Sequence, residues 1–81
     1  MEEIQNSIKS YILEEFLPGE DPELLTESTP LVTGGILDSL ATLKLVDHLE
    51  QTYQIKIEPH EIGPDNLNTL FSIAKLVKTK L

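Results

Sequence analysis

GGILDSL, residues 34–40, joins a pair of glycines to an aspartate and a serine where an amphipathic segment begins. After Asp38, large apolar residues recur at steps of three and four: Leu43, Val46, Leu49 and Tyr53. This spacing predicts a helix with Asp38 as its N-cap. Ser39 would occupy the first helical position, where side chains face outward and backbone N–H groups lack intrahelical partners. Ser39 is therefore either a polar residue tolerated at a helix start or an attachment point for another chemical group.

Two further segments have helical periodicity. Residues 3–16 place these apolar residues on one face and end before Pro18-Gly19: Ile4, Ile8, Tyr11, Ile12 and Phe16. Residues 70–81 follow the capping candidates Asn68 and Thr69 and carry a similar pattern: Leu70, Ile73, Ala74, Val77 and Leu81. Three longer helices are therefore expected.

Two connections complete the chain. Residues 17–37 form a long loop, which we expect to be held by its own apolar side chains: Leu24, Leu25, Leu31, Ile36 and Leu37. In residues 54–67, Pro59 suits the first position of a short helix that Gly63-Pro64 would stop. A strand at QIKIE, residues 54–58, would have no pairing partner. The sequence predicts an all-α, single-domain four-helix bundle over residues 1–81, with a short third helix and a long loop between the first two helices.

The composition limits the classes of partner. Fourteen acidic residues against six basic ones give a net charge of -8, which disfavours binding to nucleic acid or anionic membrane surfaces and favours a basic protein surface. The excess carboxylates could equally serve solubility alone. No apolar run approaches the ~20 residues that cross a bilayer. We expect a soluble, cytoplasmic monomer.

Catalytic and metal-binding patterns are weak. The chain has no cysteine, which excludes disulfides and cysteine-based zinc sites. His48 is expected on a solvated stripe of its helix, and His60 has no second histidine at metal-ligand spacing. Gly34-Gly35 lacks the lysine and spacing of a phosphate-binding loop. We predict no catalytic residue and no metal site.

The stretch LVTGGILDSLATLKLVDHLEQTYQIKI, residues 31–57, resembles the acyl and peptidyl carrier proteins. In that family an Asp-Ser-Leu triplet opens the second helix, and its serine receives a 4′-phosphopantetheine arm. The resemblance extends over nearly the whole chain, including the short helix near Pro59 and the last helix after Asn66-Leu67-Asn68-Thr69. It implies a non-catalytic carrier whose Ser39 is modified by a phosphopantetheinyl transferase that uses coenzyme A and magnesium. The arm would supply the thiol that this chain lacks and hold an acyl group as a thioester.

The residues that follow Ser39 differ from those of the carriers of fatty acid synthesis. Carriers of fatty acid synthesis present acidic residues just after the serine, whereas this chain has Ala41 and Lys44 at positions that we expect to be exposed. The sequence looks more like free-standing aminoacyl or acyl carriers of nonribosomal peptide and polyketide pathways. Such carriers are loaded by an adenylating ligase or an acyltransferase and then meet tailoring or condensing enzymes. A fatty-acid-type acyl carrier, a noncovalent helical adaptor and a small hydrolase using His48 are the alternatives.

The resemblance also implies a surface that partner enzymes contact. By position it would comprise Asp38, Leu40, Ala41, Leu43, Lys44 and His48 on the second helix, Thr33 and Ile36 in the loop, and Ile62 on the short helix. Leu43 also belongs to the apolar repeat, so it could be a core residue instead.

Overall fold

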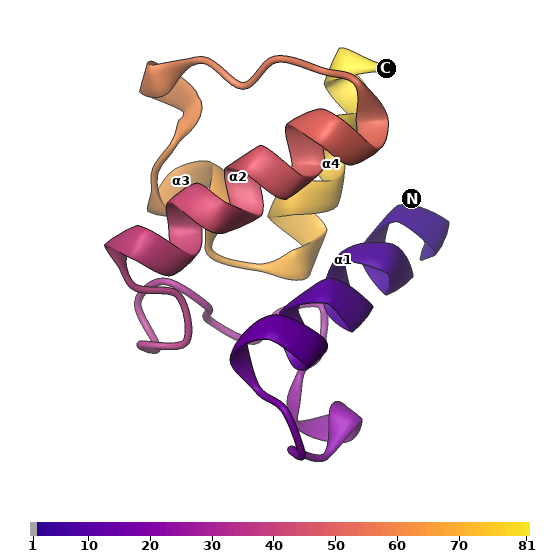
Figure 1. The fold of residues 1–81 in the computed structure, drawn as a ribbon, viewed down its shortest axis with the longest axis vertical. Helices are drawn as coiled ribbons and strands as arrows, with labels where there is room; N and C mark the ends of the chain where they lie inside the picture. Colours follow the sequence, from indigo (N-terminus) through magenta and orange to yellow (C-terminus); the bar gives the residue numbers. More distant parts are fainter. Residues whose placement is uncertain (1) are drawn as a thin grey trace.

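A computed structural model describes residues 2–81 as a bundle of helices joined by irregular segments, without a strand in that range (Figure 1). The α-helices are α1 (Glu2–Phe16), α2 (Ser39–Tyr53), α3 (Pro64–Leu67) and α4 (Leu70–Lys80). Two 3₁₀ turns lie in the connections, η1 (Pro22–Leu24) and η2 (Pro59–Glu61). The all-α prediction, with three longer helices and a long loop before α2, is confirmed.

One cluster of buried apolar residues lies at the centre of the described part of the chain. It takes side chains from all four α-helices and from both connections. Ile8 and Ile12 of α1 meet α4, which buries Ile73 and Val77. None of the helices in residues 2–81 has both the length and the apolar character that a membrane crossing requires.

Helix α2 buries Val46 and Leu49 as the sequence predicted, but two positions near its start differ from the prediction. Its core residues are Ala41, Leu45, Val46 and Leu49, while Leu43 is exposed. Ala41, Leu45 and Leu49 are four residues apart, so they share one face, whereas residues two apart do not. The expected exposure of Ala41 was therefore wrong, because this small residue begins the buried stripe.

The connection after α2 contains two short helical segments instead of one. Turn η2 begins at Pro59, as the sequence predicted, and ends at Glu61, but Gly63-Pro64 does not leave the chain irregular afterwards. Pro64 takes the first position of α3, where its missing N–H costs nothing. The Gly63 carbonyl accepts hydrogen bonds from the backbone N–H groups of Asn66 and Leu67.

The long loop is held by apolar side chains and by one amide. Leu25, Leu31 and Leu37 are buried, but Leu24, which was expected to help, is 65% exposed. The Asn68 Oδ1 accepts hydrogen bonds from the backbone N–H groups of Val32 (2.9 Å) and Thr33 (3.0 Å). Asn68, a capping candidate in the sequence, thus fastens the loop to the start of α4.

Local contacts explain both the N-cap of α4 and the presence of glycine at positions 34 and 35. Thr69 caps α4, because its hydroxyl accepts from the Ser72 N–H at 3.1 Å. Gly35 has φ +84, which a glycine adopts without strain. A Cβ on Gly34 would lie 2.3 Å from the Pro30 carbonyl oxygen, so the chain turns back on itself there with no room for a side chain.

Candidate functional site

Ser39 is the first residue of α2 and is exposed. Asp38 caps the helix, with its Oδ1 accepting from the Ala41 N–H at 2.8 Å. Just before it, Leu37 is buried, and its N–H donates to the Leu31 carbonyl at 2.9 Å. Hydrogen bonds therefore hold the backbone on both sides of Ser39. The predicted start of the helix is confirmed.

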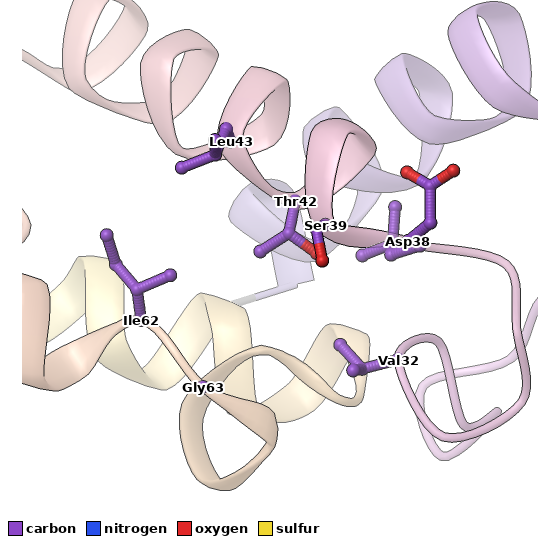
Figure 2. Close-up of a pocket in the computed structure, with 8 residues that line it drawn as sticks. Val32, Asp38, Ser39, Thr42, Leu43, Ile62 and Gly63 are labelled. Atoms are coloured by element: carbon purple, nitrogen blue, oxygen red, sulfur yellow. The ribbon is translucent and has the colours of Figure 1, made fainter.

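A groove of about 550 Å³ lies beside Ser39 (Figure 2). One side is the first turn and a half of α2, and the other is formed by the Ile62–Gly63 segment, with Val32 of the loop at one end. The Asp38 carboxylate points away from Ile62 and Gly63. The lining residues are mostly apolar: Val32, Leu37, Asp38, Ser39, Thr42, Leu43, Ile62 and Gly63.

Two large apolar side chains near Ser39 are exposed. Leu40 is 64% and Leu43 is 57% accessible to solvent. The alternative that Leu43 is a core residue is therefore excluded. These exposed leucines give the surface near the Ser39 hydroxyl an apolar character, which is common at sites of protein contact.

A match to the family described as "Phosphopantetheine attachment site" covers residues 12–77 and so includes the whole groove and Ser39. The chain belongs to this family of carrier proteins.

Known proteins similar to this carrier support the same conclusion. It is 36% identical over 75 residues to the probable acyl carrier protein PigG of Serratia sp., covering 93% of this chain and 85% of the relative. It is 42% identical over 48 residues to a D-alanyl carrier protein of Streptococcus pyogenes, covering 59% of this chain and 61% of the relative. A chain in a solved structure described as "Crystal structure of FAD-dependent dehydrogenase" superposes with a TM-score of 0.78 at 36% identity, covering 86% of this carrier and 97% of that chain.

The predicted contact residues of this carrier fall into three groups. Asp38, Ser39, Leu43 and Ile62 meet at the groove. Thr33, Leu40 and Lys44 are exposed outside its lining, and Ile36 is partly buried against the core. Ala41 is only 8% exposed and belongs to the core.

His48 is half-buried, not freely solvated as expected. Its ring stacks on Tyr11 of α1, with the ring centroids 3.7 Å apart and the planes 9° from parallel. The Tyr11 hydroxyl donates to the Lys44 carbonyl at 3.3 Å. Burial raises the pKa of Tyr11, and the negative charges of Glu15 and Asp47 raise it further. These contacts join α1 to α2 and give His48 a packing role.

Several groove residues were not identified from the sequence. Thr42 lies one turn after Ser39, so helical spacing could have found it. Val32 and Gly63 come from two different connections, and no local pattern indicates that these connections meet at Ser39.

The residues present fit a phosphopantetheine group. An attachment site needs an accessible hydroxyl, and Ser39 has one at a helix start where backbone N–H groups favour a nearby phosphate. An extended arm of amides and methylenes needs a partly apolar surface to lie on, and the groove walls formed by Val32, Leu43 and Ile62 provide one. Within residues 2–81, no cluster of three or more His, Asp or Glu residues could hold a metal ion.

Proposed function

We propose that this carrier holds an aminoacyl or acyl group as a thioester on a 4′-phosphopantetheine arm attached to Ser39 and delivers it to successive enzymes. The observation that supports this most strongly is the position of Ser39, exposed at the first residue of α2 and within the region that matches the family.

The arm would come from coenzyme A through a phosphopantetheinyl transferase. The Ser39 hydroxyl would lose its proton to the transferase or to water while its oxygen forms a bond to the β-phosphorus of coenzyme A, the pyrophosphate bond would break, and the adenosine bisphosphate half would leave. When attached, the arm supplies the thiol that this cysteine-free chain lacks. The resulting phosphodiester would lie at the positive end of the α2 dipole, an interaction worth ~0.3–1 kcal/mol, which the Asp38 carboxylate partly opposes.

The cargo that we favour is an amino acid, loaded by an adenylating ligase. One similar protein is named a D-alanyl carrier, and the superposed chain belongs to a structure described as an FAD-dependent dehydrogenase. We therefore propose that a flavin-dependent dehydrogenase acts on the carried group. Another acyl group, loaded by an acyltransferase, is the second candidate, because the Serratia relative is named an acyl carrier.

The surface of α2 supports a pathway other than fatty acid synthesis. Leu40, Leu43 and Lys44 are exposed there and carry no negative charge, so a basic groove on a partner would gain little from them. Ala41 is buried and is therefore not part of this surface. A cytoplasmic location remains a prediction from the sequence.

Intact-mass measurement tests the proposal. The wild-type chain, incubated with a promiscuous phosphopantetheinyl transferase, coenzyme A and magnesium, should gain the mass of one arm. Ser39→Ala should gain none, and Ser28→Ala, which removes another exposed serine, should behave like wild type. An unmodified wild type, or a modified Ser39→Ala, would contradict the proposal. Loading by a purified adenylating ligase with single amino acids would then identify the cargo.

A further inference from the structure

The wall of the groove opposite Ser39 is formed by a segment with little regular structure. Ile62 and Gly63 lie between the three-residue turn η2 and the four-residue helix α3. Helical segments this short are not stable by themselves, because nucleation fixes several residues for one hydrogen bond. The position of this wall must therefore depend on contacts with the rest of the fold.

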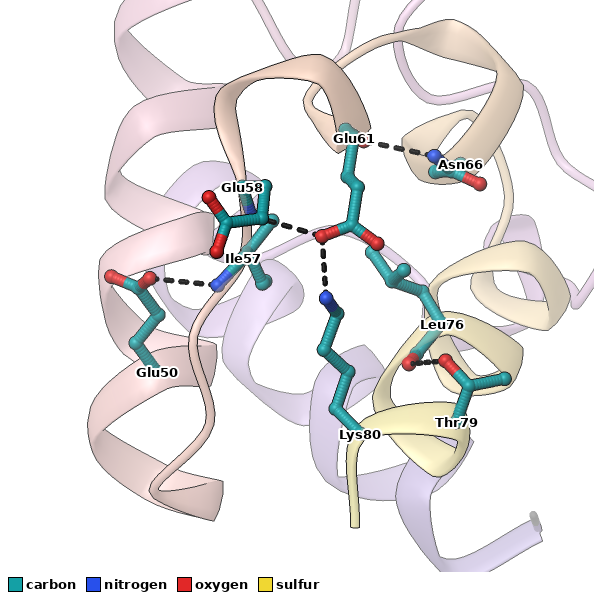
Figure 3. Close-up of polar contacts among 8 residues, drawn as sticks. All are labelled: Glu50, Ile57, Glu58, Glu61, Asn66, Leu76, Thr79 and Lys80. Carbon is teal, nitrogen blue, oxygen red and sulfur yellow. Dashed lines mark hydrogen bonds and ion pairs between the residues drawn. The ribbon is translucent and has the colours of Figure 1, made fainter.

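Glu61, the residue just before Ile62, makes two polar contacts within residues 58–66 and one with α4 (Figure 3). Its Oε1 accepts a hydrogen bond from the Glu58 N–H at 2.9 Å and another from the Lys80 Nζ at 2.5 Å. Its carbonyl accepts from the Asn66 Nδ2 at 3.0 Å. Glu61 thus links the N-cap of η2 to α3.

Lys80 connects this hydrogen-bond network to α4. It lies in the last turn of α4, far along the chain from Glu61. The Lys80 and Glu61 side chains are only 21% and 19% exposed, so solvent and salt screen this pair less than a surface pair. It is the one ion pair found among residues 2–81. Lys75 and Lys78 of the same helix are exposed.

The start of the same connection is tied to α2. The Glu50 Oε2 accepts from the Ile57 N–H at 2.9 Å, and Ile57 is buried. The connection is therefore tied to α2 at Ile55 and Ile57, before η2, and to α4 at Glu61, the last residue of η2. The tie to α4 is the one next to the groove wall.

We propose that Lys80 is a positioning residue, which holds Glu61 and thereby fixes Ile62 and Gly63 as the wall of the groove beside Ser39. This inference rests on the proposed function in one respect, that enzymes acting at Ser39 contact this wall. Its effect on partners would be exerted through Glu61, since Lys80 does not line the groove.

A helix-dipole role for Lys80 is the alternative, because cations near a helix C-terminus are stabilising. Lys78 lies in the same last turn and would serve the dipole equally well. Lys78→Met therefore removes the same charge from the same turn and leaves the Glu61 contact in place, which makes it the matched control for Lys80→Met.

Amide hydrogen exchange and chemical shifts test the positioning without any enzyme. In Lys80→Met the amide hydrogens of Glu58 and Ile62 should exchange about fivefold faster, which is the lower end of the coupling measured between sites in proteins. The chemical shift of the Gly63 amide should also change. Lys78→Met should match wild type, and Lys80→Arg should restore most of the protection. Glu61→Met, which removes the acceptor of both hydrogen bonds, provides a second route to the loss if Lys80→Met folds poorly. Equal exchange in wild type, Lys80→Met and Glu61→Met would overturn the inference.

Transferase kinetics test the consequence at Ser39. Lys80→Met should raise KM for the carrier by about fivefold with little change in kcat, because the wall contacts the enzyme and takes no part in the chemistry. A wild type that accepts no arm would refute the proposed function, while the exchange data would still decide the positioning. A modified wild type with unchanged KM in Lys80→Met would overturn the role of Lys80 at the groove.

Discussion

Asn68→Ala is expected to destabilise the fold by releasing the long loop that leads to Ser39. The substitution removes the Oδ1 that accepts from the Val32 and Thr33 N–H groups. It leaves the Asn68 backbone carbonyl, which accepts from the Leu31 N–H, in place. The loss is therefore confined to the amide side chain.

The magnitude follows from the burial of the two donors. The Val32 bond is partly buried, so its N–H would lose its partner without full access to water, at a cost of ~1–3 kcal/mol. The Thr33 bond is exposed, and water can replace it at little cost. A total near 2 kcal/mol is a large share of the roughly 5–15 kcal/mol that stabilises a typical domain.

Urea unfolding followed by circular dichroism measures this change. With a slope of about 1 kcal/mol/M for a small protein, the midpoint should fall by about 2 M. Asn68→Asp keeps the acceptor oxygen and loses only the donor to the Thr33 Oγ1, 3.2 Å away, so it should stay near the wild-type midpoint. This role of the Asn68 side chain is refuted if the urea midpoint of Asn68→Ala falls by less than about 0.5 M, or if the midpoint of Asn68→Asp falls equally far.

Three further predictions concern stability. Gly34→Ala should lower the urea midpoint, because the new Cβ would meet the Pro30 carbonyl oxygen at 2.3 Å; an unchanged midpoint would show that the loop relaxes freely. Leu45→Ala should cost about 2–5 kcal/mol in the same assay, since Leu45 is fully buried in the core, and a loss below about 1 kcal/mol would contradict that placement. The Lys80 hydrogen bond holds the pKa of Glu61 below its usual range, so its stabilising effect is present above the unfolded-state pKa and lost as the pH falls through the folded-state pKa. The gap in midpoint between wild type and Lys80→Met should therefore close in acid, and a gap independent of pH would count against the pair.

The sequence was most informative where the determinants are local. The cap at Asp38, the start of α2 at Ser39 and the turn at Pro59 each depend on a few consecutive residues, and each prediction is confirmed. The prediction about Gly63-Pro64 was half right, because proline both stops one helix and starts the next.

The rest depends on contacts between distant residues. Ala41 was misplaced because the apolar face was assigned from the largest side chains, although a small residue can begin a buried stripe. Asn68 and Thr69 are both capping residue types, and periodicity cannot say which one caps α4 and which one reaches the loop. The groove wall at Ile62 depends on the ion pair between Glu61 and Lys80, and neither residue carries a pattern that indicates its partner.

Fragmentation mass spectrometry of the wild-type chain after reaction with coenzyme A and a phosphopantetheinyl transferase locates the new phosphodiester, and so tests whether Ser39 carries the arm. We predict a single arm on the fragment that contains Ser39 and on no other hydroxyl. An arm found on Thr42 or Ser28, or a chain that stays unmodified while folded, would contradict this prediction.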